Sequence, residues 1–145
     1  MRFRLARPAI FGLADGLMSM LGVILYLSGH ESLVFPTALS GGISSALSMA
    51  GGEWLSDSDN GLGASCVMGL ATGVGAILPA IPYAFTSGVT AITCSVAICV
   101  LIAAVVALMR PMRSRALAFA ETYAVLVAIF LLVLACGLFL PGSAA

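Results

Sequence analysis

The sequence predicts an all-α membrane protein made of five transmembrane helices. Hydrophobic residues make up 61% of its 145 positions and charged residues only 8%, whereas a soluble domain usually carries about 25% charged residues. The mean hydropathy is +1.17, and the apolar residues form five runs that are each long enough to cross a bilayer as a helix. The linkers between these runs are too short to hold a soluble domain. We therefore expect one transmembrane domain over residues 1–145.

The five predicted spans follow one another with short connections. We place them at about residues 8–28, 33–55, 62–84, 89–109 and 117–140. Pro8 suits the first turn of the first helix, where a missing N–H costs no hydrogen bond. Asp15 and the full length of the first run argue against a cleaved signal peptide. Pro79 and Pro82 are expected to kink or end the third helix.

Arginine placement predicts the orientation of the bundle. The chain has no lysine, and its arginines form two groups, one before the first span and one between the fourth and fifth spans: Arg2, Arg4 and Arg7, then Arg110, Arg113 and Arg115. Basic segments next to spans stay in the cytoplasm. With five spans, both groups lie on the same side. We therefore expect a cytoplasmic N-terminus and a C-terminus outside.

Composition excludes several classes of function. Six acidic residues balance the six arginines, so the chain lacks the basic surface that nucleic-acid binding requires. Its four cysteines lie in apolar runs without metal-finger spacing, and we expect them to pack as inert apolar side chains. We find no nucleophile–base pair and no cofactor motif, so we expect neither an enzyme nor a permanently bound cofactor.

Asp15 is the first candidate site residue, because it lies inside the first predicted span. No arginine or lysine lies inside any span to neutralise it. An acid within the membrane usually marks a functional site. The alternative is a neutral carboxyl group that is hydrogen-bonded for packing. Ser19 follows one helical turn later on the same side and is a secondary candidate for an ion pathway.

The end of the second span supplies the next candidates. Ser45, Met49 and Glu53 are spaced by four residues and so share one face of a helix. Small residues around them allow neighbouring helices to approach closely. The turn that follows carries Asp57 and Asp59. These acids either cap the next helix or attract cations to the Met49–Glu53 face.

Three other charged or titratable residues are expected to form ion pairs or to face solvent and are not site candidates. Glu121 opens the fifth span close to the second arginine group, and we expect it to pair with Arg113 or Arg115. His30 and Glu31 lie between the first two spans and are expected to be solvated.

Three motifs, in this order, resemble those of the vacuolar iron transporter family. They are Phe11-Gly-Leu-Ala-Asp15-Gly16-Leu, Ser48-Met49-Ala-Gly-Gly-Glu53-Trp54 and Gly75-Ala-Ile-Leu-Pro79-Ala-Ile-Pro82-Tyr83. The chain departs from the family at Ala14, where an Asn usually precedes the acid. It also has only the turn 56–60 where many members carry a long cytoplasmic segment rich in Glu and Met, so it resembles a short form without the metal-collecting domain.

The resemblance implies a five-helix bundle that forms a homodimer, with the N-terminus in the cytoplasm. It also implies export of Fe²⁺, and often Mn²⁺, from the cytoplasm in exchange for protons. Asp15, Met49 and Glu53 are the residues that match the family's motifs, and the resemblance implies that they line the ion path near the dimer axis.

The donor atoms of these residues fit that function. Carboxylate oxygen suits Fe²⁺ and Mn²⁺, while a thioether disfavours Mg²⁺ and Ca²⁺. A carboxyl group removed from water tends to hold a proton until a metal displaces it, which couples the two ions. One chain offers few ligands, so a second copy is expected as the partner, within a lipid bilayer. The composition, with arginine as the only basic residue type besides one His and much Ala and Gly, suggests a bacterial cell membrane. The alternative function is a non-transporting structural or regulatory membrane subunit.

Overall fold

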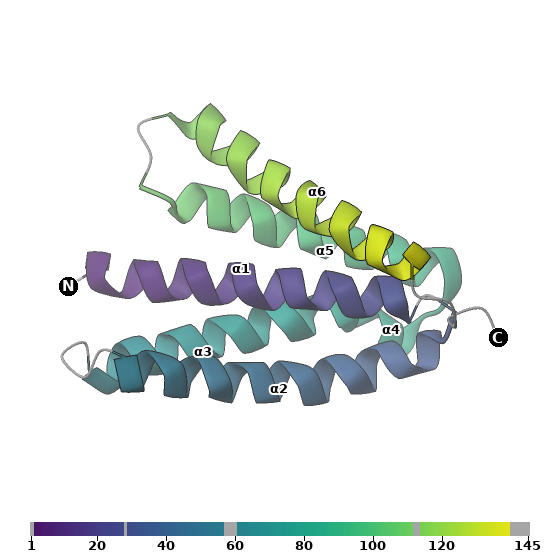
Figure 1. Cartoon of the computed structure of the whole chain (residues 1–145), viewed down its shortest axis with the longest axis horizontal. Coiled ribbons are helices and arrows are strands. Elements are labelled where there is room, and N and C mark those ends of the chain that lie inside the picture. Colours follow the sequence, from purple (N-terminus) through teal and green to yellow (C-terminus); the bar gives the residue numbers. More distant parts are fainter. Residues whose placement is uncertain (1, 28, 57–60, 112–113, 140–145) are drawn as a thin grey trace.

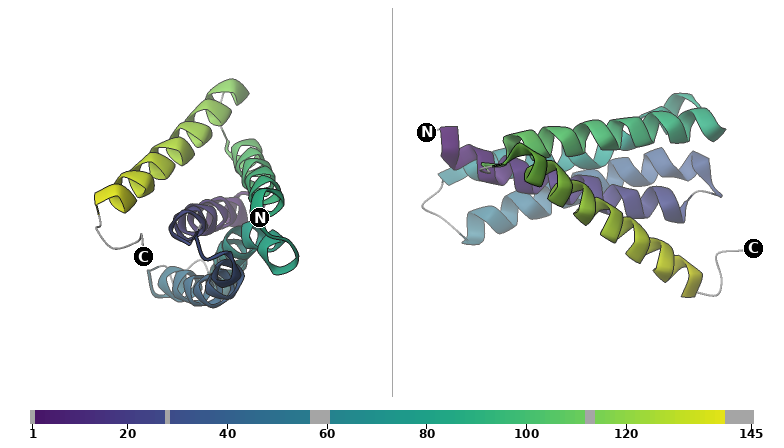
Figure 2. Two further views of the ribbon diagram at one scale, coloured as in Figure 1. Left: turned by 90° about the vertical axis from the view of Figure 1, so that its right-hand side faces the viewer. Right: turned by 90° about the horizontal axis from the view of Figure 1, so that it is seen from above.

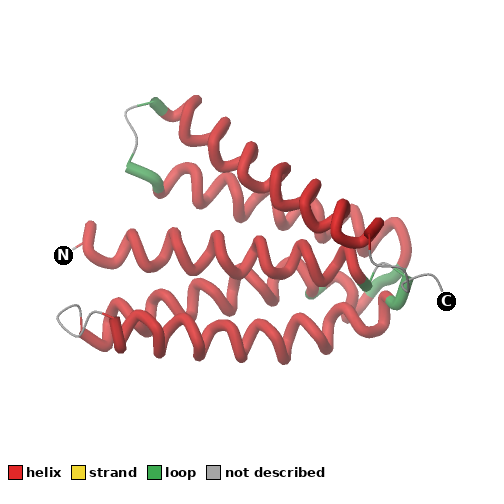
Figure 3. Tube along the Cα trace, in the orientation of Figure 1, coloured by secondary structure: helices red, strands yellow, loops and turns green. Residues whose placement is uncertain are grey.

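The computed structural model describes residues 2–27, 29–56, 61–111 and 114–139. Within these ranges every regular element is helical and no strand occurs (Figure 3). The elements are α1 (Arg2–Tyr26), α2 (Glu31–Ser56), α3 (Gly61–Ile77), the 3₁₀ turn η2 (Leu78–Ala80), α4 (Pro82–Phe85), α5 (Gly88–Met109) and α6 (Arg115–Phe139).

Five of these helical stretches are long and apolar enough to cross a membrane: Leu5–Tyr26, Glu31–Ser56, Leu62–Ala80, Gly88–Met109 and Arg115–Ala135. Many large apolar side chains on them face outward, including Leu47, Leu70 and Leu101. Water would disfavour such a surface, whereas lipid accepts it. The chain is therefore an integral membrane protein, as its composition indicates.

One proline lies where it was not expected and two end a helix as expected. α1 begins at Arg2, so Pro8 lies inside the helix and not in its first turn. The third span is divided at Pro79 and Pro82, as predicted, because α3 ends at Ile77 and the chain continues as η2 and α4. The Pro79 carbonyl accepts a hydrogen bond of 2.7 Å from the buried Ser95 hydroxyl of α5. A neighbouring helix thus supplies the donor at the point where the regular helix stops.

α1 lies at the centre of the bundle, with α2 and α3 on one side and α5 and α6 on the other (Figure 1). α6 diverges from the rest of the bundle along its length (Figure 2). The buried core on the α5 side joins Leu17 of α1 to Cys99, Ile102 and Val106 of α5 and Leu126 of α6. α1 therefore holds the two halves of the molecule together.

Glycines bring α3 close to both of its neighbours. A Cβ atom at Gly12 or Gly16 of α1 would collide with the Met68 or Thr72 carbonyl of α3. At Gly69 of α3 it would lie 2.7 Å from the Ala46 carbonyl oxygen of α2 and 2.8 Å from Ala50 Cβ. Small residues allow such close approach between membrane helices. These contacts fix the register of α1, α2 and α3.

The end of the bundle where α2 and α5 begin is joined by a polar contact. Glu31 Oε2 accepts a hydrogen bond of 2.7 Å from the Gly88 N–H, the first residue of α5. An acidic side chain at a helix N-terminus accepts a hydrogen bond from a free backbone N–H, and its negative charge interacts favourably with the helix dipole. Gly88 has a φ of 63°, which favours glycine. The expectation that Glu31 is merely solvated is therefore wrong, whereas His30 is exposed.

The opposite end carries the described arginine side chains. Arg110 Nη2 donates to Glu121 Oε2 at 2.6 Å and so ties α6 to the end of α5. The expectation that Glu121 pairs with Arg115 is wrong, because Arg115 donates instead to the Leu108 carbonyl. Arg113 lies outside the described residues. Arg110 is better placed because the last turn of α5 faces the first turns of α6.

Candidate functional site

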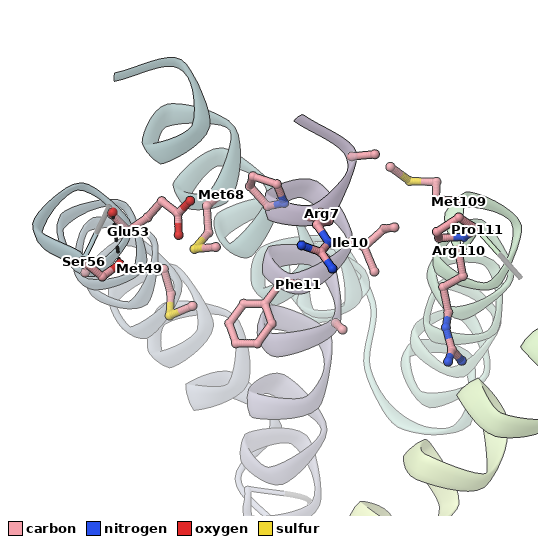
Figure 4. Close-up of a pocket in the computed structure, with 14 residues that line it drawn as sticks. Arg7, Ile10, Phe11, Met49, Glu53, Ser56, Met68, Met109, Arg110 and Pro111 are labelled. Carbon is pink, nitrogen blue, oxygen red and sulfur yellow. Dashed lines mark hydrogen bonds between the residues drawn. The ribbon is translucent and has the colours of Figure 1, made fainter. Parts of the chain in front are cut away.

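A cavity of about 1350 Å³ opens at the arginine-bearing end of the bundle. It crosses α1, with α2 and α3 on one side and the end of α5 on the other (Figure 4). Most of its lining is apolar. Its polar and sulfur-bearing side chains are Arg7, Met49, Glu53, Ser56, Met68, Met109 and Arg110.

α2 contributes Met49 and Glu53 to this cavity. The four-residue spacing expected to place them on one face does so, and both are half-buried. Ser56 donates a hydrogen bond of 3.2 Å to the backbone carbonyl of Glu53 and leaves the carboxylate unused (Figure 4). No described side chain forms an ion pair with the Glu53 carboxylate. Its oxygens are therefore available to a cation that enters the cavity.

α3 contributes Met68, a residue that sequence reasoning missed. Its side chain is only 8% exposed, and it lines the same cavity as Met49. In Figure 4 the Glu53 carboxylate and the two thioethers lie on one side of the Phe11 ring, and Arg7 lies on the other. The residues at helical spacing from Met68 include Ser65 and Thr72 but no charged side chain that would mark it as a metal contact. Only the register between α2 and α3 reveals it.

Asp15 does not line this cavity, although Phe11, one turn earlier on the same face of α1, does. Two contacts of α3 show how far Asp15 lies from the arginine-bearing end of the bundle. A Cβ at Gly75 would meet the backbone of Leu13 and Leu17, so Gly75 lies level with Asp15 between them. A Cβ at Gly73 would meet Ala46 of α2. Asp15 is therefore near the depth of Ser45, about one helical turn beyond Met49.

The Asp15 side chain is half-buried and makes no hydrogen bond or ion pair with the described residues. Within one chain the structure thus brings Met49 and Glu53 together and leaves Asp15 one level deeper. The described residues contain no group of three or more His, Cys, Asp or Glu side chains that could hold a metal. A metal in the cavity would consequently depend on mixed oxygen and sulfur donors.

The secondary candidates are dispersed. Ser19 is exposed on α1, and Ser45 is half-buried on α2. Asp57 and Asp59 lie outside the described residues. Pro79 lies in η2 and Pro82 begins α4, both beyond the end of α3 that is distant from Met68.

Two arginines set the charge of the cavity wall. Arg110 is engaged by Glu121, while Arg7 forms no ion pair with a described carboxylate. Arg7 and Glu53 thus face the same cavity with opposite charges and without direct pairing. A cation entering there meets attraction from α2 and repulsion from α1.

Comparison with known proteins gives one family match. Residues 6–61 match the model of the VIT family. This range covers Asp15, Met49 and Glu53, and it confirms the resemblance to vacuolar iron transporters over α1 and α2. No curated protein and no solved structure matches the chain. Over this range the chain is similar to a family of membrane transporters of metal ions.

Proposed function

We propose that this chain, with its VIT family match over α1 and α2, exports Fe²⁺ or Mn²⁺ from the cytoplasm in exchange for protons. The observation that carries the proposal is the shared cavity of Met49 and Glu53 at the arginine-bearing end. The positive-inside rule assigns that end to the cytoplasm. Arginine as the chain's main basic residue type and its abundant Ala and Gly favour a bacterial cell membrane as the site of action.

The proposed path has three levels. Glu53 lies nearest the cytoplasmic end and makes the first contact, and Met49 follows one turn deeper. Asp15 and Ser45 then lie near a common depth one turn further. In this proposal the metal and protons compete for the same carboxylate oxygens along the path. Alternation of metal and proton on the same oxygens would couple the two fluxes.

A second copy of the chain completes the ligand set in this proposal. One face of α2 carries exposed small and hydroxyl-bearing residues at helical spacing. They are Thr37, Gly41, Ser44, Ser48 and Gly52. Hydroxyl groups gain little from lipid, whereas a second helix can approach such a small-residue face closely. The same arrangement would give Asp15 a carboxylate partner from the second copy. Two chains would thereby supply paired carboxylate and thioether donors to one ion.

The proposal is tested with purified protein in proteoliposomes that hold a pH gradient. Wild-type protein should move Fe²⁺ or Mn²⁺, and Asp15→Asn and Met49→Ala should each abolish most of that flux while the protein stays folded. Thr93→Ala is a matched control, because Thr93 is exposed on α5 and, among the described residues, its hydroxyl bonds only to Val89 of its own helix. Folded wild-type protein without metal flux would contradict the proposal and favour a non-transporting subunit.

A further inference from the structure

The cavity contains a thioether that the family's motifs do not include, that of Met68 on α3. We propose that Met68 contacts the transported metal together with Met49 and Glu53, and that this thioether pair makes the cavity prefer Fe²⁺ over Mn²⁺. The inference rests on the proposed transport of metal and narrows its substrate.

Helix contacts on both sides hold Met68 in place. A Cβ at Gly12 would collide with the Met68 carbonyl, so α1 and α3 are nearly in backbone contact at this residue. Gly69, the next residue, lies against Ala46 and Ala50 of α2. The Thr72 hydroxyl also donates a hydrogen bond of 2.9 Å to the Met68 carbonyl. The Met68 backbone is therefore held at the junction of three helices.

The same contacts bring Met49 to the level of Met68. Gly69 meets Ala50 Cβ across the α2–α3 contact, and each methionine directly precedes one of these two residues in the sequence. Both side chains line the cavity, and Figure 4 shows them on the side that holds the Glu53 carboxylate. One carboxylate and two thioethers thus converge from two helices. Phe11 of α1 forms the wall beside them.

This donor set is softer than the one expected from sequence. Mn²⁺ stands lowest in the affinity order of the divalent first-row metals and prefers oxygen donors, whereas thioethers select softer ions. A second sulfur donor in place of an oxygen donor should therefore lower the affinity for Mn²⁺ more than the affinity for Fe²⁺. An unbranched methionine that only filled space in the core would have no such effect on the choice of metal.

The experiment measures equilibrium binding of Fe²⁺ and of Mn²⁺, each alone, to purified full-length protein under anaerobic conditions. Metal flux is measured in parallel on the same preparations. Met68→Leu keeps an apolar side chain of similar volume and removes the sulfur. Met109→Leu is the matched control, because Met109 lines the cavity from α5, on the far side of α1 from Glu53 (Figure 4). Thermal unfolding of each variant establishes that it is folded.

We expect wild-type protein to bind Fe²⁺ more tightly than Mn²⁺. Met68→Leu should lose about tenfold in Fe²⁺ affinity and change Mn²⁺ affinity less than about twofold, while Met109→Leu should change neither. Met68→Gln, which offers an amide oxygen, should shift the preference toward Mn²⁺.

Two results would overturn the inference: equal affinity of the wild type for both metals, or equal losses for both metals in Met68→Leu. Selective binding without flux would instead contradict the transport function and leave Met68 a metal contact. Flux without selectivity would uphold transport and refute the role of Met68.

Discussion

Gly16 of α1 lies directly against the Thr72 carbonyl of α3, with no room for a Cβ atom between them. This contact adjoins Asp15 in the sequence, and Thr72 is fully buried. The packing of two helix backbones therefore fixes the position of the acid that the proposed ion path needs. Any change that separates α1 from α3 also moves Asp15.

Gly16→Ala should destabilise the bundle, because the added methyl group must push α1 and α3 apart. We expect a loss of about 1–3 kcal/mol in the free energy of unfolding, as for other overpacked positions. Chemical or thermal unfolding in detergent measures this loss. Gly63→Ala is the matched control, since nothing lies within 4 Å of its Cβ position. Equal stability of both variants would show that the α1–α3 contact tolerates separation.

Glu53→Gln should weaken metal loading more than it weakens the fold. Its carboxylate lines the cavity without an ion-pair partner among the described residues, so its loss removes a charged ligand and leaves no group unpaired. The metal concentration for half-maximal flux should rise about tenfold or more, since each 1.4 kcal/mol of lost binding is tenfold in affinity. Glu31→Gln, at the other end of α2, should leave the metal concentration for half-maximal flux unchanged. An unaltered flux curve for Glu53→Gln would exclude the carboxylate from loading.

Arg7→Gln should have the opposite effect on metal loading. Arg7 lines the same cavity as Glu53 and repels cations there. Its neutralisation should raise the apparent affinity for the metal by about threefold at low ionic strength, with a smaller gain at high salt because exposed charges are screened. Flux titrations at two salt concentrations measure this difference. Weaker loading in Arg7→Gln would indicate that Arg7 positions Glu53 and does not repel the ion.

Glu121→Gln should change stability only slightly, although it breaks the Arg110–Glu121 ion pair. The Arg110 side chain is 30% exposed and that of Glu121 is 50% exposed, so solvent weakens their attraction. Exposed pairs usually contribute about 0.2–1 kcal/mol, and less at high salt. Denaturant unfolding at low and high ionic strength tests this. A loss well above that range would reveal that the pair holds α6 to α5.

Local sequence properties determined the helical class, the number of apolar helices and the pairing of Met49 with Glu53. Apolar run length decides which segments can cross a bilayer, and a spacing of four residues places side chains on one face of any helix. These properties need no knowledge of neighbouring helices. The VIT family resemblance likewise rests on residues that are close together in the sequence, and residues 6–61 confirm it.

Only the tertiary structure decided which helices meet and at what depth. The inclusion of Met68 in the cavity depends on the Gly69 contact between α2 and α3, and the placement of Asp15 one level deeper depends on Gly73 and Gly75. The partner of Glu121 proved to be Arg110, because the crossing of α5 and α6 selects among several nearby arginines. Such pairings follow from the register between helices, which close backbone packing sets and which no single helix encodes.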